Sequence, residues 1–449
     1  MYTFEVSGKS LRQYKGMGTL IAPDDTRFEG GFEFVQRADG RLVGKFYFED
    51  RALDLPVSDP EGRFLHYALK GTTIQGWDAW SDTLYIVSRT HNTPGPDEVV
   101  FHAVSMEVTL FELTYDTDNS AMYFARFGLV NLQFDGNRID LDVNGHKISI
   151  NKVDGYSNVI EFLKTHRGIE VTCEAFVRLK DAEVTDRLLS TMRDICVLLS
   201  FASGTRVNWV YHDIMIAPKM PARSYLFGDA ITLPFSTHRL IARSQRTLAQ
   251  FVNNTFDVYR AKKEDYGLYS VLAMYLVAKI PHLFVGSRIL LINQALEALK
   301  SSMTPEYMLD EAKLDEELKA LTGGIKKTWL KSFPELRKSE TKSTLDAITS
   351  RERVKGLARL SYPRGLKNVV ESLQFPREHE KELKDRINKL IAVRNVLTHD
   401  ALTYEKTDVE AYQDFTRFIN LTDVILLKIL EYKGEYLDCS DGYVAKTLD

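Results

Sequence analysis

Short runs of alternating apolar and polar side chains fill the first 180 residues and end in Gly, Asp or Asn. Alternation with a period of two is typical of β-strands that bury one face. The pattern predicts strands over 42–48, 84–88, 99–104, 106–110 and 123–130, and a further pair around 159–163 and 168–179. The clearest element is a hairpin of 139–143 and 146–150, because the Asn144-Gly145 pair between them tolerates the positive φ of a tight turn.

After residue 180 the hydrophobic period becomes helical. A helix over 185–203 is expected to stop at Gly204, and a strand over 206–211 follows. Three prolines then interrupt the pattern at 218, 221 and 234, so a domain boundary is expected between 216 and 236. Beyond it the period predicts helices over 238–261, 265–280, 284–302, 308–321, 343–360, 377–399 and 407–432. The last begins with a capping box, Thr407-Asp-Val-Glu410.

These elements predict an α+β protein of two domains. A β-rich, sandwich-like domain is expected over 1–225 and an all-α domain over 236–449. The length agrees with this division, because 449 residues exceed what one ordinary core holds.

Charge is distributed unevenly along the chain. The net charge of −4 does not indicate nucleic-acid binding by the chain as a whole. Residues 321–390, however, hold 17 basic and 9 acidic side chains, a net of +8. This stretch favours either a local surface for a polyanion or a solvated, lysine-rich helix face.

Cysteines and long apolar runs bear on the compartment. Cys173, Cys196 and Cys439 are scattered without a pairing pattern, which is typical of a reducing environment. The N-terminus shows no basic and then apolar leader, and no run approaches the roughly 20 apolar residues that span a bilayer. A cytoplasmic protein without a membrane partner is expected.

An arginine interrupts one apolar helix face near the C-terminus. The face is formed by positions 383, 387, 390, 394 and 397, and all but Arg394 are Leu or Ile. Burying a guanidinium is costly unless it is paired or used. His399 follows five residues later, where the helix is expected to end, and Asn395 lies four residues before it, within reach on the same face.

These side chains suit phosphodiester chemistry. An arginine can hold two phosphoryl oxygens as their charge grows, and a histidine exchanges protons near neutral pH. Asn395 is positioned to orient the imidazole or the phosphate. The structural alternative is a core arginine that bridges the helix C-terminus, with His399 only capping it.

The Arg-Asn-x-x-x-His motif at the end of one long helix, with another after it, resembles the Arg-x4-6-His signature of the HEPN superfamily. The resemblance covers roughly residues 240–435. The earlier helix, from Ser287, resembles the first HEPN helix, in which an acidic side chain supports the motif, here Glu297. A solvated helix face explains Glu297 equally. The layout of a β-rich half before a HEPN domain is similar to that of ApeA-like anti-phage proteins.

The resemblance implies a metal-independent endoribonuclease without cofactors, with Arg394, His399, Asn395 and Glu297 at its site. It also implies a homodimer that brings two motifs into one cleft, RNA as substrate with tRNA a candidate, and a setting of abortive infection. The N-terminal domain would then sense a phage-derived trigger. The alternative is a non-catalytic HEPN-like dimerisation or nucleotide-binding module beside a ligand-binding β domain.

Three other patterns are better explained without function. Arg206 and His212 match the loose motif spacing but lie on a predicted strand. The stretch 140–145 resembles the start of a calcium loop but lacks its final glutamate, so a hairpin is expected. Trp77 and Trp80 are expected in a sandwich core rather than on a sugar or base platform.

Overall fold

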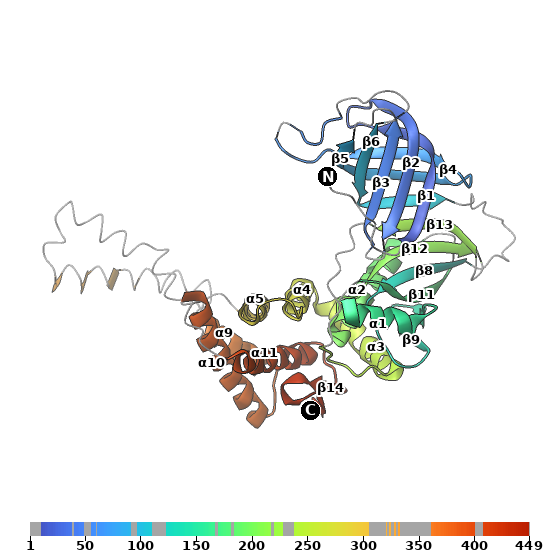
Figure 1. The fold of residues 1–449 in the computed structure, drawn as a ribbon. Coiled ribbons are helices and arrows are strands. Elements are labelled where there is room, and N and C mark those ends of the chain that lie inside the picture. The colour runs from blue at the N-terminus through green and yellow to red at the C-terminus, as the bar shows by residue number, and fades with distance from the viewer. Residues whose placement is uncertain are drawn as a thin grey trace. The chain divides into compact units, whose positions relative to one another are not determined.

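The computed structural model describes residues 10–37, 40–48, 55–59, 61–90, 97–109, 123–166, 169–180, 184–216, 220–227, 238–304, 361–399 and 407–448, with residues 320, 323–324, 327–328 and 331–332 (Figure 1). They form two compact units. The first contains Met1–Ala261, Leu276–Leu283 and Leu430–Leu448, and the second contains Lys262–Tyr275 and Phe284–Ile429, with Asp449.

An antiparallel sheet dominates the described part of the first unit. Its strands are β1 (Ser10–Ile21), β2 (Arg27–Arg37), β3 (Leu42–Phe48), β4 (Tyr67–Thr73), β5 (Asp78–Thr90), β6 (Glu98–Ala103), β7 (Ser105–Thr109), β8 (Tyr123–Val130), β9 (Arg138–Val143), β10 (His146–Lys152), β11 (Val171–Leu179), β12 (Asn208–Ile216) and β13 (Met220–Phe227). Their order is β4-β1-β2-β3-β6-β5-β7-β13-β12-β8-β11-β10-β9.

The first six strands of this order close into a barrel, because β4 also pairs with β5 (Figure 1). Alternate positions point inward and fill the barrel with aromatic rings, among them Phe32, Phe34, Phe46 and Phe101. The expected sandwich-like arrangement is therefore wrong in its architecture, although the β-rich character is confirmed. Alternation predicts which face is buried, but closure depends on the pairing of β1 with β4, which are separated in the chain by two other strands.

The remaining seven strands continue the sheet and carry three helices, α1 (Tyr156–His166), α2 (Asp186–Ser203) and α3 (Gln245–Lys262). The predicted helix over 185–203 is confirmed, with Thr185 capping its start and Gly204 at φ 66° at its end. The strand predicted over 159–163 is wrong, because that segment lies in α1. The strand β13 was not predicted, because Pro221 and the prolines at 218 and 234 indicated a linker.

Helix α3 belongs with the sheet and not with the later helices. Its Gln245 accepts hydrogen bonds from the backbone N–H groups of Asn137 and Arg138, and its Asn253 accepts one from Asp142 N–H. These N–H groups lie at or beside β9, the last strand of the sheet, so α3 covers an edge that would otherwise be open to pairing.

The C-terminal hairpin of β14 (Glu435–Asp438) and β15 (Val444–Thr447) also belongs to the first unit. Leu437 N–H donates to Leu240 O at 2.7 Å, and the Tyr432 ring packs against Phe251 of α3. The expected single boundary between 216 and 236 therefore differs from the division in the structure, where the chain returns to the first unit twice. A linear pass along the sequence assigns each domain one continuous segment, so it misses such returns.

The second unit is helical. It contains residues 268–275 of α4 (Leu268–Ala278), and α5 (Val285–Met303), α9 (Tyr362–Ser372), α10 (Arg377–His399) and α11 (Asp408–Ile429). The predicted capping box is confirmed: Glu410 N–H donates to Thr407 Oγ1, and Thr407 N–H donates to Glu410 Oε2. The helices predicted over 308–321 and 343–360 lie largely or wholly outside the described residues, and α9 was not predicted.

Two further properties follow from burial and length. Cys173 and Cys196 are free thiols in the core, and burial raises the pKa of each to about 12. Among the helices described, none has the length and apolar character needed to cross a membrane.

Candidate functional site

Helix α10 presents the apolar face that its sequence predicts. Leu383, Ile387, Leu390 and Leu397 are buried, while Arg394 on the same face is half-buried. The helix ends at His399, as expected, and α11 begins nine residues later at Asp408. The guanidinium therefore lies one to two turns before a helix end, at the margin of the core of the second unit.

An aromatic ring on α9 faces this arginine. The guanidinium carbon of Arg394 lies 6.0 Å from the centre of the Tyr362 ring, at the outer limit of a cation–π contact. Arg394 Nη1 also donates to Asn395 Oδ1 at 3.4 Å, a long hydrogen bond. Neither contact neutralises the charge of Arg394, so the guanidinium keeps donors for an anion.

Tyr362 connects α9 to α5. Its hydroxyl donates to the backbone oxygen of Asn293 at 3.2 Å. Burial raises the pKa of Tyr362 above its usual value, Glu297 raises it further, and Arg394 partly offsets both. The phenol is therefore a neutral hydrogen-bond donor at physiological pH. The negative charge of Glu297 and the positive charge of Arg394 both act on it.

Asn293 on α5 has a buried side-chain oxygen with unusual surroundings. The residue is 3% exposed, and its Oδ1 is buried without a hydrogen-bond partner in the described part of the chain. A buried acceptor left unsatisfied costs about 1–3 kcal/mol, so such atoms are uncommon. The structure places Asn293 inside the second unit.

The predicted site residues are brought together in part. Arg394 and Asn395 are in contact, and Glu297, which is exposed, is close enough to influence the pKa of Tyr362. His399 is the last residue of α10, and its side chain lies outside what the structure describes. Sequence reasoning missed Tyr362, whose signal is the Ser-Tyr-Pro start of a helix, where proline is favoured.

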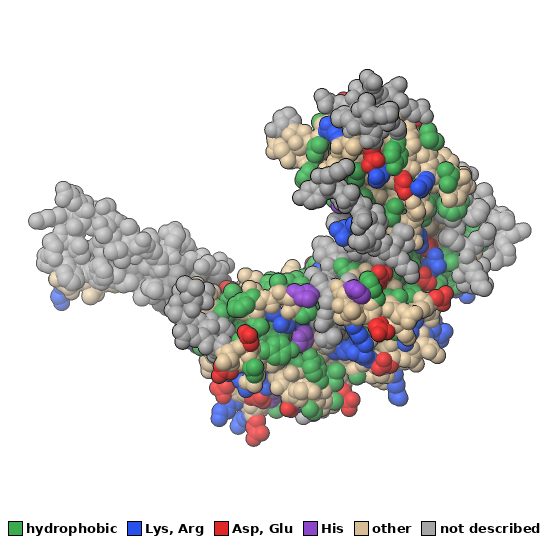
Figure 2. All heavy atoms as spheres, in the orientation of Figure 1, with side chains coloured by type: hydrophobic (Ala, Val, Ile, Leu, Met, Phe, Trp, Pro, Cys, Tyr) green, Lys and Arg blue, Asp and Glu red, His purple; other side chains and the backbone are tan. Residues whose placement is uncertain are grey.

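Three of the six Lys and Arg side chains of α10 pair with carboxylates in the described part of the chain. Lys384 pairs with Glu371 and Glu380, Arg386 with Glu382, and Lys389 with the buried carboxylate of Asp414. On the described part of the face in Figure 2, charged side chains of both signs are interspersed. Residues 377–390, the part of the basic segment that lies in α10, therefore fit a solvated helix face better than a surface for a polyanion.

The other sequence patterns have structural explanations. His212 is buried between aromatic rings, 4.6 Å from the Tyr225 ring centre, so its spacing from Arg206 is coincidental. The stretch 140–145 forms the predicted hairpin. Trp77 packs against the barrel core, but Trp80 is 47% exposed, which corrects its expected core position.

Within the described residues, no three His, Cys, Asp or Glu side chains gather as a metal site would require. Comparisons of the chain with protein-family models, with curated proteins and with solved structures found no match.

Proposed function

We propose that the chain is a metal-independent endoribonuclease of the HEPN type whose cleavage site contains Arg394 and His399. The observation that carries the proposal is Arg394 itself. It interrupts a buried apolar face five residues before the helix ends at His399, and among the described residues no carboxylate neutralises it. A half-buried, unneutralised guanidinium is costly to keep unless it binds an anion.

The reaction that fits these groups is an internal transesterification of RNA. The 2′-oxygen loses its proton and bonds to phosphorus, while the bond from phosphorus to the 5′-oxygen breaks and that oxygen gains a proton. His399 exchanges one of these protons, because an imidazole titrates near neutral pH. Arg394 donates to the phosphoryl oxygens as negative charge develops on them.

The neighbouring side chains act in support. Asn395 orients the guanidinium or the phosphate through its amide. Tyr362 holds the arginine side chain against α9, and Glu297 on α5 contributes negative charge near the phenol. None of the three takes a proton in this scheme.

A homodimer would supply the second acid or base from the other copy. The proposed setting, inferred from the resemblance alone, is defence against phage by abortive infection, with tRNA a candidate substrate and the β-rich part sensing a phage-derived trigger. The competing hypothesis, a non-catalytic dimerisation or nucleotide-binding module, predicts no cleavage of RNA.

The test is cleavage of total RNA and of tRNA in EDTA by the purified full chain. Wild type should cleave, while His399→Ala and Arg394→Ala should each lose at least about a hundredfold in rate, the contribution of a positioned acid–base or charge-stabilising group. His379→Ala and Arg377→Ala on the same helix serve as matched controls and should cleave like wild type.

Cleavage that survives His399→Ala would remove this histidine from the mechanism. A wild-type protein that cleaves no RNA, alone or with phage lysate added as a trigger, would favour the non-catalytic reading.

A further inference from the structure

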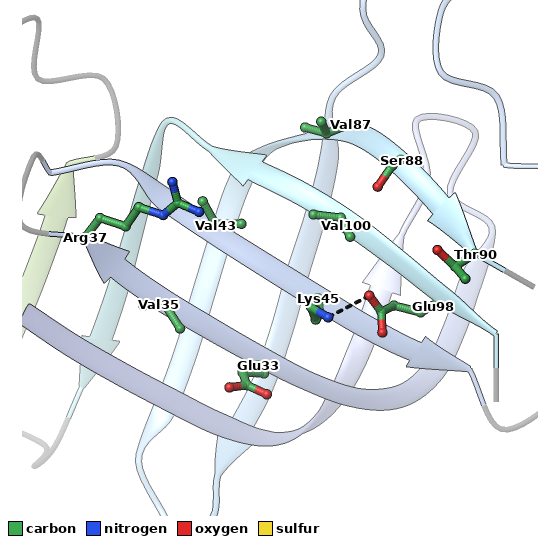
Figure 3. Close-up of a pocket in the computed structure, with 10 residues that line it drawn as sticks. All are labelled: Glu33, Val35, Arg37, Val43, Lys45, Val87, Ser88, Thr90, Glu98 and Val100. Atoms are coloured by element: carbon green, nitrogen blue, oxygen red, sulfur yellow. Dashed lines mark ion pairs between the residues drawn. The ribbon is translucent and has the colours of Figure 1, made fainter. Parts of the chain in front are cut away.

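A hollow of about 890 Å³ lies on the outer face of the barrel, over β2, β3, β5 and β6 (Figure 3). Its volume lies within the range of roughly 300–1,000 Å³ that is typical of small-molecule sites. Four valines contribute its apolar surface: Val35, Val43, Val87 and Val100. Val100 is only 8% exposed, although its strand neighbours Val99 and Phe101 point into the barrel, so it belongs to the deep part of the hollow.

A β-bulge in β5 shapes one wall. The pairing of β5 with β6 shifts register between Ile86 and Ser88, so Val87 is an extra residue on its strand. In a regular strand consecutive side chains point to opposite faces, but here both Val87 and Ser88 line the hollow. Bulges commonly re-aim side chains at binding sites.

Among the described residues, the charges at the hollow leave Arg37 without an acidic partner. Lys45 pairs with Glu98 at 2.8 Å, and Glu33 pairs with Lys15 at 3.2 Å. Arg37 lines the same hollow, and no acidic residue in the described part of the chain pairs with its guanidinium. Figure 3 shows that the guanidinium extends toward Val43, so its donors border the apolar surface.

We propose that this hollow binds a small molecule with an apolar body and a single anionic group. The valines bury the body, Arg37 binds the anion, and the hydroxyl groups of Ser88 and Thr90 offer further hydrogen bonds. The proposal concerns the barrel alone, so its test does not depend on the proposed ribonuclease activity.

The test uses two fluorescent probes with similar apolar bodies, the sulfonate 8-anilinonaphthalene-1-sulfonate and the neutral N-phenyl-1-naphthylamine. The full chain should bind one sulfonate probe per molecule. Arg37→Ala, and Arg37→Gln as a second variant, should weaken sulfonate binding about tenfold and leave neutral-probe binding within about twofold, because only the charged hydrogen bonds are lost.

Two controls make the result decisive. Arg27→Ala, an exposed arginine on the same strand outside the hollow, should bind both probes like wild type. Val43→Trp fills the hollow with a strand-compatible ring and should weaken both probes. Thermal melting checks that each variant is folded. The proposal is overturned if wild type shows no saturable binding, if the Arg37 variants affect both probes equally or neither, or if Val43→Trp changes nothing.

Discussion

At the residue scale, Arg394 lies beside a ring and an amide, and neither cancels its charge. The Tyr362 hydroxyl is anchored to the Asn293 carbonyl, so the ring is a fixed surface for the guanidinium. In the proposed mechanism this is a positioning role. The sequence could not predict this contact, because Arg394 and Tyr362 lie on different helices and no characteristic sequence spacing relates them.

Two substitutions of Tyr362 distinguish the contribution of its ring from that of its hydroxyl. Tyr362→Phe keeps the ring, so unfolding free energy should fall by about 1 kcal/mol and the RNA cleavage rate should stay within about threefold. Tyr362→Ala frees the arginine and should lower kcat about tenfold. Single-turnover cleavage and chemical denaturation measure the two effects. If both variants cleave RNA equally well, the ring has no positioning role.

His212 makes a second residue-scale prediction, on stability against pH. Burial lowers the pKa of His212 to about 4, although Asp213 raises it somewhat. The folded state therefore binds its proton at lower pH than the unfolded state, whose imidazole titrates near 6.5. The resulting stability is fully present above about pH 6.5 and is lost as pH falls toward 4.

The measurement compares wild type with His212→Phe, which keeps an aromatic ring beside Tyr225 and Phe127. From about pH 7.5 to 4.5, wild type should lose about 2–3 kcal/mol more unfolding free energy than the variant. His146, whose pKa burial also lowers, affects both proteins alike. Parallel pH profiles for the two proteins would contradict the assignment.

At the element scale, one buried carboxylate joins three strands. Asp213 on β12 accepts two hydrogen bonds from Arg12 of β1, at 2.8 and 2.9 Å, and two from Arg126 of β8. Burial alone would raise the pKa of Asp213, but the two arginines outweigh it and hold the pKa below its usual value. The contact links the barrel to the rest of the sheet across 201 residues of chain.

Breaking this network should be costly. Asp213→Ala leaves Arg12 without its anion and Arg126 with only its longer contact to Glu174, at 3.6 Å, and should lower unfolding free energy by about 3–5 kcal/mol in chemical denaturation. Replacing all three residues by apolar ones, Arg12→Met, Arg126→Met and Asp213→Leu, should recover much of that loss, because the buried carboxylate and both of its guanidinium partners are removed together and only the partly exposed Glu174 loses a cation. If Asp213→Ala costs less than about 1 kcal/mol, the network does not join these strands.

How far the sequence predicts the elements depends on how local their signals are. The hairpin at Asn144-Gly145, the end of α2 at Gly204 and the capping box at Thr407 rest on a few adjacent residues, and all three are confirmed. Barrel closure, the place of α3 on the sheet edge and the contact of Tyr362 with Arg394 depend on distant partners. Periodicity carries no information about which distant partners meet.

At the scale of the whole molecule, each of the two units carries its own proposed activity. The first holds the hollow on the barrel that Arg37 lines, and the second holds Arg394 and the end of α10. These proposals have separate tests, so the failure of one leaves the other standing.

The most direct test of the central claim is the chemistry of the ends left on cleaved RNA. Wild type acting on a defined RNA in EDTA should leave 2′,3′-cyclic phosphate and 5′-hydroxyl ends, detected by mass spectrometry, and should spare a substrate with 2′-deoxyribose at the cleaved position. The Arg394→Ala, His399→Ala double variant should produce none of these fragments. Fragments with 5′-phosphate ends, or the same fragments from the double variant, would contradict cleavage by this arginine and this histidine.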